Sequence, residues 1–268
     1  MAFAGAGRAV LVPTYLPETW ALQTAFTTKA NAKRLGLIDR TIRSLKNAGI
    51  HDLMDTYGFT AAHASQAARQ NWKSPGAYTL TAINSPTFTT DRGYKGDGSS
   101  AYLKTGLTLS AAVKYQQNSG SLGIFVRQAA TGTFSRYLSA ENGSTAVGTI
   151  LVGGASDTAG FGVNSSQGNI LYPAGSPNVA NSLLIADRDG AASMKAYRNG
   201  SLLGSGAPAS VAVPAYEVYL LSRNNAGATG SLSNGELSFW CIGASLSAAQ
   251  HAALNTIVNT YLAAVGAV

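Results

Sequence analysis

Paired carboxylates are the side chains that could cleave a glycan, because glycoside hydrolysis places two of them across the sugar bond. The chain has only 12 Asp and Glu residues, and no stretch has the Glu-x-Asp-x-Glu spacing that would align carboxylates on one face of a strand. The closest pair, Asp187 and Asp189, precedes Gly190, where such side chains commonly stabilise a turn. A polysaccharide depolymerase is therefore disfavoured, although carboxylates distant in sequence can still converge.

Histidine and serine form no stronger catalytic pattern. His51, His63 and His251 are scattered along the chain, and none has the spacing of a His-Glu-x-x-His metal site. The sequence also lacks the Gly-x-Ser-x-Gly motif that exposes a nucleophilic serine. We therefore predict that the protein is not an enzyme.

Three aspartates could contribute to a calcium site, since Ca²⁺ requires several oxygen ligands. Asp97, Asp187 and Asp189 are the candidates. The alternative for the first of them is structural, because Gly96-Asp97-Gly98-Ser99 is typical of a tight turn before a strand. We favour the turn and expect no cofactor, with calcium left open.

Carbohydrate binding without cleavage needs a shallow groove with exposed aromatic rings and a few polar groups for the sugar hydroxyls. Side chains near predicted loops and strand ends could form such a groove. The candidates are Tyr94, Tyr102, Arg136, Tyr137, Asn164 and Tyr172. The alternative for each tyrosine is packing in the core or at its rim.

Cys241 is the only cysteine, so no disulfide can form within the chain. It lies in the apolar sequence Phe239-Trp240-Cys241-Ile242, which predicts a buried strand and a thiol that packs as a small hydrophobic group. A link between chains is left open.

The composition is weakly charged, with 12% charged residues against about 25% in average soluble proteins. The net charge of +7 is concentrated at the start, where residues 1–77 have nine Lys and Arg against four Asp and Glu. No nucleic-acid motif accompanies this basic region, so we expect no nucleic-acid partner. The apolar run at residues 9–12 is too short for a membrane span or a signal-peptide core.

The first third of the chain has a helical pattern in only part of its length. Residues 1–27 have no clear period and are interpreted as an arm, whereas residues 28–48 have apolar positions at helical spacing and end before Gly49. A second, weaker helical pattern covers residues 61–69. We expect three regions: an arm at 1–27, a helical segment at 28–77 and a β-sandwich at 78–268.

Beyond residue 78 the chain alternates short β-rich runs with turn residues, which predicts an antiparallel sandwich. Asn199-Gly200 predicts a type I′ hairpin turn, and Asp189-Gly190 a similar one. Ser247 and Gln250 form a capping box before a C-terminal helix. The expected strands are 121–127, 135–139, 149–152, 160–163, 182–186, 193–198, 217–222 and 236–243.

Two segments resemble a known family. The first runs from Ser85 to Thr105 and includes Pro86-Thr87-Phe88-Thr89-Thr90-Asp91-Arg92-Gly93-Tyr94 and Lys95-Gly96-Asp97-Gly98-Ser99. The second runs from Leu183 to the Tyr197-Arg198-Asn199-Gly200 hairpin and Ser205. Both resemble the concanavalin A-like, laminin-G-like sandwich proteins of tailed-bacteriophage virions. The resemblance covers roughly residues 35–265. It implies a mainly β fold, an antiparallel jelly-roll sandwich with an N-terminal amphipathic helix and a C-terminal helix.

The resemblance also implies a role: a structural virion component of a tail fibre, collar, neck or head appendage, located in the virion. We expect partners to be copies of the chain, as a trimer or higher ring, and other virion proteins. Docking to these proteins is assigned to Tyr15, Trp20, Lys29, Lys33, Arg40 and Arg43. The alternative function is a receptor module that binds host surface polysaccharide, followed by a depolymerase.

Overall fold

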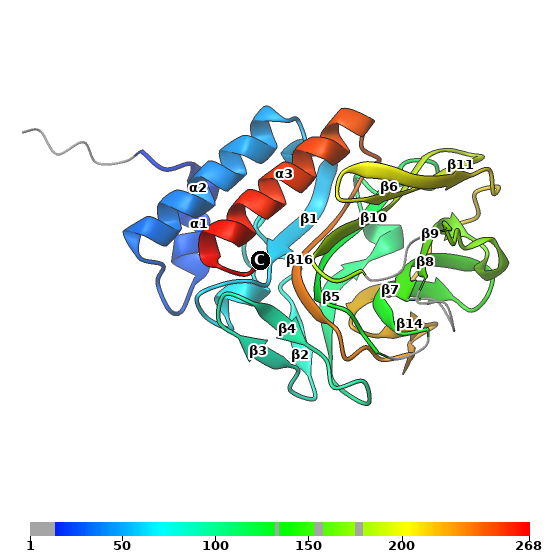
Figure 1. The fold of residues 1–268 in the computed structure, drawn as a ribbon, viewed down its shortest axis with the longest axis horizontal. Coiled ribbons are helices and arrows are strands. Elements are labelled where there is room, and N and C mark those ends of the chain that lie inside the picture. The colour runs from blue at the N-terminus through cyan, green and yellow to red at the C-terminus, as the bar shows by residue number, and fades with distance from the viewer. Residues whose placement is uncertain (1–13, 132–133, 153–157, 175–178) are drawn as a thin grey trace, which may run out of the picture.

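The computed structural model describes residues 14–131, 134–152, 158–174 and 179–268. Three layers follow one another in Figure 1: helices, a sheet that we call sheet A, and a second sheet that we call sheet B. The two sheets form a β-sandwich, and helices from the N-terminal and C-terminal parts of the chain cover one side. The predicted fold class is confirmed.

Sheet A has eight strands, all paired antiparallel. Its spatial order is β12 (Ser201–Gly206), β11 (Ser193–Arg198), β10 (Ser182–Gly190), β6 (Gly120–Gln128), β16 (Glu236–Gly243), β4 (Gly93–Lys95) and β3 (Thr87–Thr89), with β1 (Met54–Phe59) also paired to β16. The Asn199-Gly200 turn between β11 and β12 has positive φ at both residues, as predicted.

Sheet B also has eight strands and is antiparallel except for the pairing of β14 with β7. Its path is β15 (Ala228–Gly230), β14 (Arg223–Asn225), β7 (Arg136–Asn142), β13 (Glu217–Leu220), β5 (Tyr102–Thr108) and β2 (Thr81–Ile83), while β8 (Ala146–Val152) pairs with β7 and β9 (Ala159–Ser165) pairs with β8. Short 3₁₀ turns connect several elements: η1 (His51–Leu53), η2 (Ala67–Arg69), η3 (Leu109–Ala111) and η4 (Gln167–Asn169).

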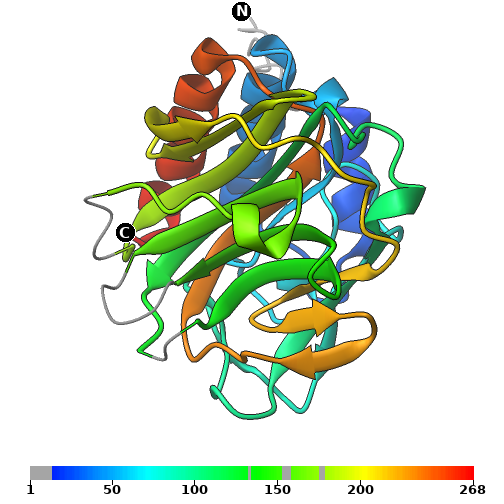
Figure 2. The ribbon, with the colours of Figure 1, turned by 90° about the vertical axis from the view of Figure 1, so that its right-hand side faces the viewer.

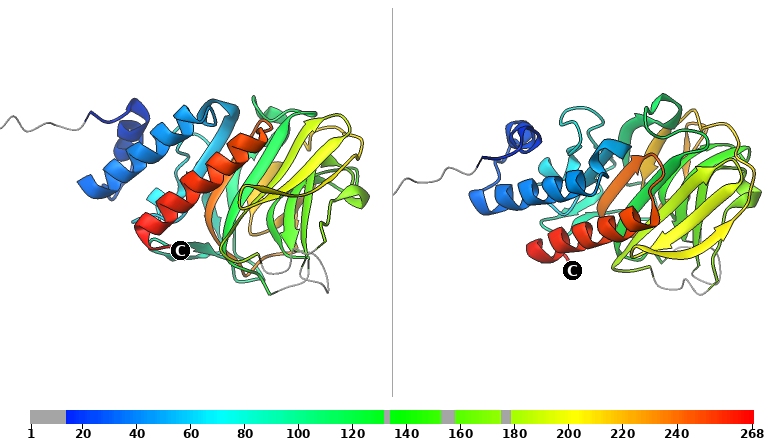
Figure 3. Two further views of the ribbon diagram at one scale, coloured as in Figure 1. Left: turned by 45° about the horizontal axis from the view of Figure 1, so that its top comes forward. Right: turned by 90° about the horizontal axis from the view of Figure 1, so that it is seen from above.

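Three helices, α1 (Pro17–Ala25), α2 (Ala32–Asn47) and α3 (Ala248–Val265), cover sheet A on the side away from sheet B (Figure 3). The apolar face of α2 is buried at the predicted spacing, and α3 begins with the predicted capping box. Between these helices and sheet A, Phe59 of β1 packs 4.2 Å from Tyr261 and 4.8 Å from Phe239, measured between ring centroids. Sheet A is therefore buried on both faces.

The N-terminal region differs from the prediction in three ways. Residues 17–25 of the expected arm form α1, because Pro17 occupies the first helical turn, where proline is favoured, and Leu22 and Phe26 are buried. Residues 61–69 form only the short turn η2. The segment 28–77, expected to be helical, also contributes β1 to sheet A, where it pairs with β16. Residues 1–13 lie outside the described part of the chain.

Two smaller predictions are also corrected. The expected turn at Asp189-Gly190 lies two residues later, because β10 continues to Gly190 and pairs it with Ser193. Cys241 is buried in β16 as predicted, and burial raises the pKa of its thiol to about 12. Within the described residues, no helix is both long and apolar enough to cross a membrane.

Candidate functional site

The outer face of sheet B, meaning the face that points away from sheet A, carries polar and aromatic side chains. The register of the strands defines it. One row across the sheet lies in the core and consists of Leu103, Leu220, Leu138, Ile150 and Phe161. The adjacent row points outward because side chains alternate along a strand, and it consists of Thr81, Lys104, Tyr219, Ser139 and Thr149.

An aromatic pair lies at the β5–β13 side of this outer face. The rings of Tyr102 and Tyr219 are 5.0 Å apart, and the amine of Lys104 lies 5.4 Å from the centre of the Tyr219 ring. This is within the range of a cation–π interaction. Both rings are mostly buried, so they form a packed base from which Lys104 projects.

A β-bulge turns Arg136 towards the same face. Strand β7 shifts its register against β8 so that Arg136 lies opposite Leu151 while Leu138 lies opposite Ile150. The extra residue, Tyr137, changes which side chains share a face. Because of this bulge, Arg136 points to the outer face instead of the core.

Glu141 holds Arg136 in place. Its Oε1 atom accepts hydrogen bonds from Arg136 Nε at 3.1 Å and Ser139 Oγ at 2.8 Å, and its Oε2 atom accepts one from Arg223 Nε at 2.6 Å. The Glu141 side chain is fully buried. Two guanidinium groups therefore share one carboxylate, which leaves this part of the outer face positively charged.

Two exposed rings flank Arg136. Tyr172 is 44% exposed and lies over Gly160, where a Cβ atom would come within 2.6 Å of its ring. Gly160 lies on β9 and pairs with Leu151 of β8, which in turn pairs with Arg136, so Gly160 and Arg136 belong to the same row. On the other side, the backbone carbonyl of Phe134 accepts a hydrogen bond from Arg136, and the Phe134 ring is 52% exposed. Figure 2 is viewed onto this side of the molecule.

The structure thus places three predicted glycan contacts, Tyr102, Arg136 and Tyr172, on or over the outer face of sheet B, and it places the other three inside the protein. The Tyr94 hydroxyl donates to a backbone carbonyl, the Tyr137 hydroxyl accepts from a backbone N–H, and Asn164 is fully buried. A buried ring or amide cannot contact a sugar, so these three residues are not glycan contacts. Arg136 and Tyr102 are also buried, at 4% and 8% exposure, so Tyr172 is the exposed member of the six.

The three predicted calcium ligands lie apart and are engaged by protein donors. Asp97 accepts the backbone N–H groups of residues 99–101 at 2.7–2.8 Å, which holds the pKa of its carboxyl well below the ordinary range and confirms the tight turn. Asp187 accepts from residues 245 and 246, and Asp189 from Ser193 and Lys195. Within the described residues, no three His, Cys, Asp or Glu side chains cluster as a metal site would.

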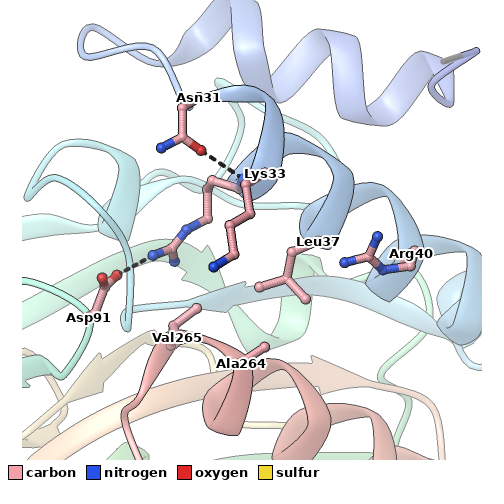
Figure 4. Close-up of a pocket in the computed structure, with 8 residues that line it drawn as sticks. Asn31, Lys33, Leu37, Arg40, Asp91, Ala264 and Val265 are labelled. Atoms are coloured by element: carbon pink, nitrogen blue, oxygen red, sulfur yellow. Dashed lines mark hydrogen bonds and ion pairs between the residues drawn. The ribbon is translucent and has the colours of Figure 1, made fainter.

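A groove between α2 and α3, which we call the α2–α3 groove, forms a second candidate site. It contains two cavities, of about 260 and 240 Å³, which share Leu37 and Arg40 as lining residues. In Figure 4 the Lys33 side chain extends towards the first cavity, and Ala264 and Val265 of α3 lie opposite. Two of the predicted docking residues, Lys33 and Arg40, therefore meet at one groove.

The other four predicted docking residues lie elsewhere. Lys29 precedes α2 and donates to two carbonyls at the end of α1, and Arg43 pairs with Asp39. One continuous helix over residues 28–48 would place the four basic docking residues on one face, but they do not share a face because Lys29 precedes α2 and Arg43 turns to Asp39. Tyr15 and Trp20 contact each other edge to face at 5.4 Å, and the Trp20 side chain is 50% exposed.

Comparisons with known proteins identify the fold. No protein-family model matches the sequence, and no curated protein sequence matches it. Among solved structures, a Trypanosoma rangeli sialidase mutant that displays trans-sialidase activity is 12% identical with a TM-score of 0.51, over 86% of this chain and 40% of that one. The botulinum neurotoxin serotype G binding domain is 10% identical with a TM-score of 0.52, over 76% of this chain and 51% of that one.

These likenesses establish a shared sandwich fold. This chain spans less than two thirds of the length of either protein, and both identities are low. The fold alone therefore does not identify the function.

Proposed function

We propose that this chain is a carbohydrate-binding module that holds a glycan on the outer face of sheet B. The observation that carries the proposal is the 44% exposed ring of Tyr172, which lies over Gly160 in the row of the buried Arg136. An exposed ring offers an apolar surface to the C–H face of a sugar, and the Arg223 guanidinium, whose side chain is 21% exposed and held by Glu141, donates to the sugar's hydroxyls or carboxylate.

The arrangement is suited to binding because its polar groups are fixed before the glycan arrives. Arg136 and Arg223 are both held by the buried Glu141, so little side-chain entropy is lost on binding. The same fold occurs in a sialidase, whose name indicates glycan cleavage, and in a toxin domain that is named as a binding domain. This likeness supports the proposal only through the fold.

We propose binding without cleavage. A glycosidase needs one carboxylate that is protonated and one that is free to attack or to activate water. Glu141 is engaged by two arginines and a serine, and Glu217, on β13, accepts the backbone N–H of Gly106 at 2.7 Å. Incubation with a bound polysaccharide should release no new reducing ends; their appearance would replace the binding proposal with a depolymerase.

Substitution of Tyr172 tests the proposal. Tyr172→Ala should weaken binding to the best ligand on a glycan array about tenfold, or about 1.4 kcal/mol, because it removes the exposed stacking surface. Trp20→Ala is the matched control, since it removes an equally exposed ring on the helical side. Equal affinities of Tyr172→Ala and the unsubstituted protein would refute this location for the site.

We further propose that the module is a virion appendage of a tailed bacteriophage and assembles as a trimer or higher ring. This placement rests on the resemblance of residues 85–105 and 183–205 to sandwich proteins of such virions. Gold-labelled antibodies on purified particles should mark a fibre, collar, neck or head surface. Sedimentation of the purified protein should give three or more copies; a monomer would refute the assembly.

A further inference from the structure

The α2–α3 groove has an excess of positive charge. Its lining includes Lys33, Arg34 and Arg40 of α2 and one carboxylate, that of Asp91. Arg34 is already paired with Asp91 at 2.6 Å and donates to the hydroxyl of Tyr261. The side chains of Lys33 and Arg40 therefore remain available to bind a ligand.

Lys33 and Arg40 are placed to act together. They lie seven residues apart on α2 with Leu37 between them, so all three side chains project from one face, and the Cα atoms of the two cations are about 10 Å apart. In the described part of the chain, neither cation has a hydrogen-bond or ion-pair partner. In Figure 4 the Arg40 guanidinium points back along α2 towards Leu37.

The second cavity adds hydroxyl groups. Three of its lining residues, Thr41, Thr256 and Thr260, donate their hydroxyl protons to helix carbonyls, at 2.8, 3.1 and 2.7 Å. A hydroxyl that donates to the backbone keeps its oxygen lone pairs as acceptors. The groove therefore offers charged donors at Lys33 and Arg40 and neutral acceptors at the threonines.

We infer that the α2–α3 groove binds a sugar acid, meaning a carboxylated, polyhydroxylated ring. Its carboxylate lies between Lys33 and Arg40, its C–H face lies on Leu37 and Val265, and its hydroxyls donate to the threonine oxygens. A neutral sugar would leave the two cations unpaired, and a simple anion would leave the threonines unused. This site is separate from the outer face of sheet B and goes beyond the proposed function.

Titration of the intact protein by isothermal calorimetry or NMR tests the inference with four probes: D-glucuronate, D-glucose, acetate and inorganic phosphate. Glucuronate should bind at least tenfold more tightly than each of the others. If glucose bound as tightly as glucuronate, the two cations would have no role in binding. Acetate or phosphate binding equally well would remove the role of the hydroxyl acceptors. Either result would overturn the inference.

Substitutions locate the site. Lys33→Gln and Arg40→Gln should each weaken glucuronate binding at least tenfold, and both positions are exposed, so folding should be preserved. Lys114→Gln is the control, because it removes an exposed positive charge far along the chain from α2. Unchanged affinity in both groove variants would refute the site. Tyr172→Ala should bind glucuronate normally; loss of binding there instead would move the sugar acid to sheet B and leave the proposed function standing.

Discussion

At the scale of single residues, the burial of the Arg188 side chain is the most unusual feature of the sandwich. It is fully buried and has no carboxylate partner among the described residues. Its Nε donates to Val163 of β9 at 2.7 Å, and its Nη1 lies 3.1–3.2 Å from three further backbone carbonyls. Burial lowers the pKa of Arg188 below its ordinary value. One side chain from sheet A thereby satisfies carbonyls of β9 in sheet B, of the end of β10 and of two loop residues.

Arg188→Met should destabilise the fold by about 3 kcal/mol, because it leaves several buried carbonyls without donors. Urea denaturation measures the free energy of unfolding. Arg69→Met is the control: Arg69 makes one long hydrogen bond, of 3.4 Å, to Ser65, and its loss should change stability by less than about 0.5 kcal/mol. Similar losses in both variants would contradict the role given to Arg188.

A second residue, His51, should make stability depend on pH. Burial, followed by the charges of Lys73 and Lys46, lowers its pKa below 6.5, against a smaller opposing effect of Glu18. The unfolded chain therefore takes up a proton that the folded chain resists, so stability is complete above about pH 6.5 and falls as the pH drops below it. The free energy of unfolding should decrease between pH 7 and pH 5. His51→Gln should flatten this slope; an unchanged slope would contradict the assignment.

At the scale of elements, a single carboxylate attaches α3 to sheet A. Asp187 of β10 accepts hydrogen bonds from the Ser245 hydroxyl at 2.7 Å and the Leu246 N–H at 3.0 Å, immediately before the helix. The ring of His251 lies 3.3 Å from the same carboxylate and stacks on Tyr197. The residue predicted as a calcium ligand thus has a structural role at the start of a helix.

Asp187→Ala should cost about 2–4 kcal/mol and increase hydrogen exchange in the first turns of α3, since it removes acceptors from buried donors. Asp189→Ala is the matched control two residues later, because its pair with Lys195 is exposed and should contribute less than about 1 kcal/mol. Equal effects of the two substitutions would contradict the anchoring role.

The sequence predicted elements well where local signals were strong. The strands 193–198 and 236–243 have the predicted bounds, and the Asn199-Gly200 turn has the predicted conformation. Strand β1 was missed because its pairing with β16 bridges about 180 residues of sequence, and no local pattern reports such a partner. Helix α1 could have been found from Pro17 and the acidic Glu18 in its first turn.

At the scale of the whole molecule, sheet register decides which side chains form a site. Arg136 and Tyr172 were predicted as glycan contacts, whereas Glu141, Tyr219 and Arg223 were missed. Alternation along one strand cannot show which strands are neighbours, and the bulge at Tyr137 switches the face of Arg136. The groove cations Lys33 and Arg40 could be paired from helical spacing, but the opposing α3 comes from the other end of the chain.

The same layering gives the molecule two separate surfaces. The outer face of sheet B and the α2–α3 groove lie on opposite sides of the three layers (Figure 1). A glycan on sheet B therefore leaves the helical side free for a second ligand or for a neighbouring protein.

A hydrogen-exchange footprint of the intact protein with its best glycan-array ligand tests where the glycan binds. Binding on the outer face of sheet B predicts slower exchange in β7 and β8 and around Tyr172, with α2 and α3 unchanged when the ligand has no carboxylate. Protection confined to α2 and α3, or no protection in sheet B at saturating ligand, would contradict glycan binding on sheet B.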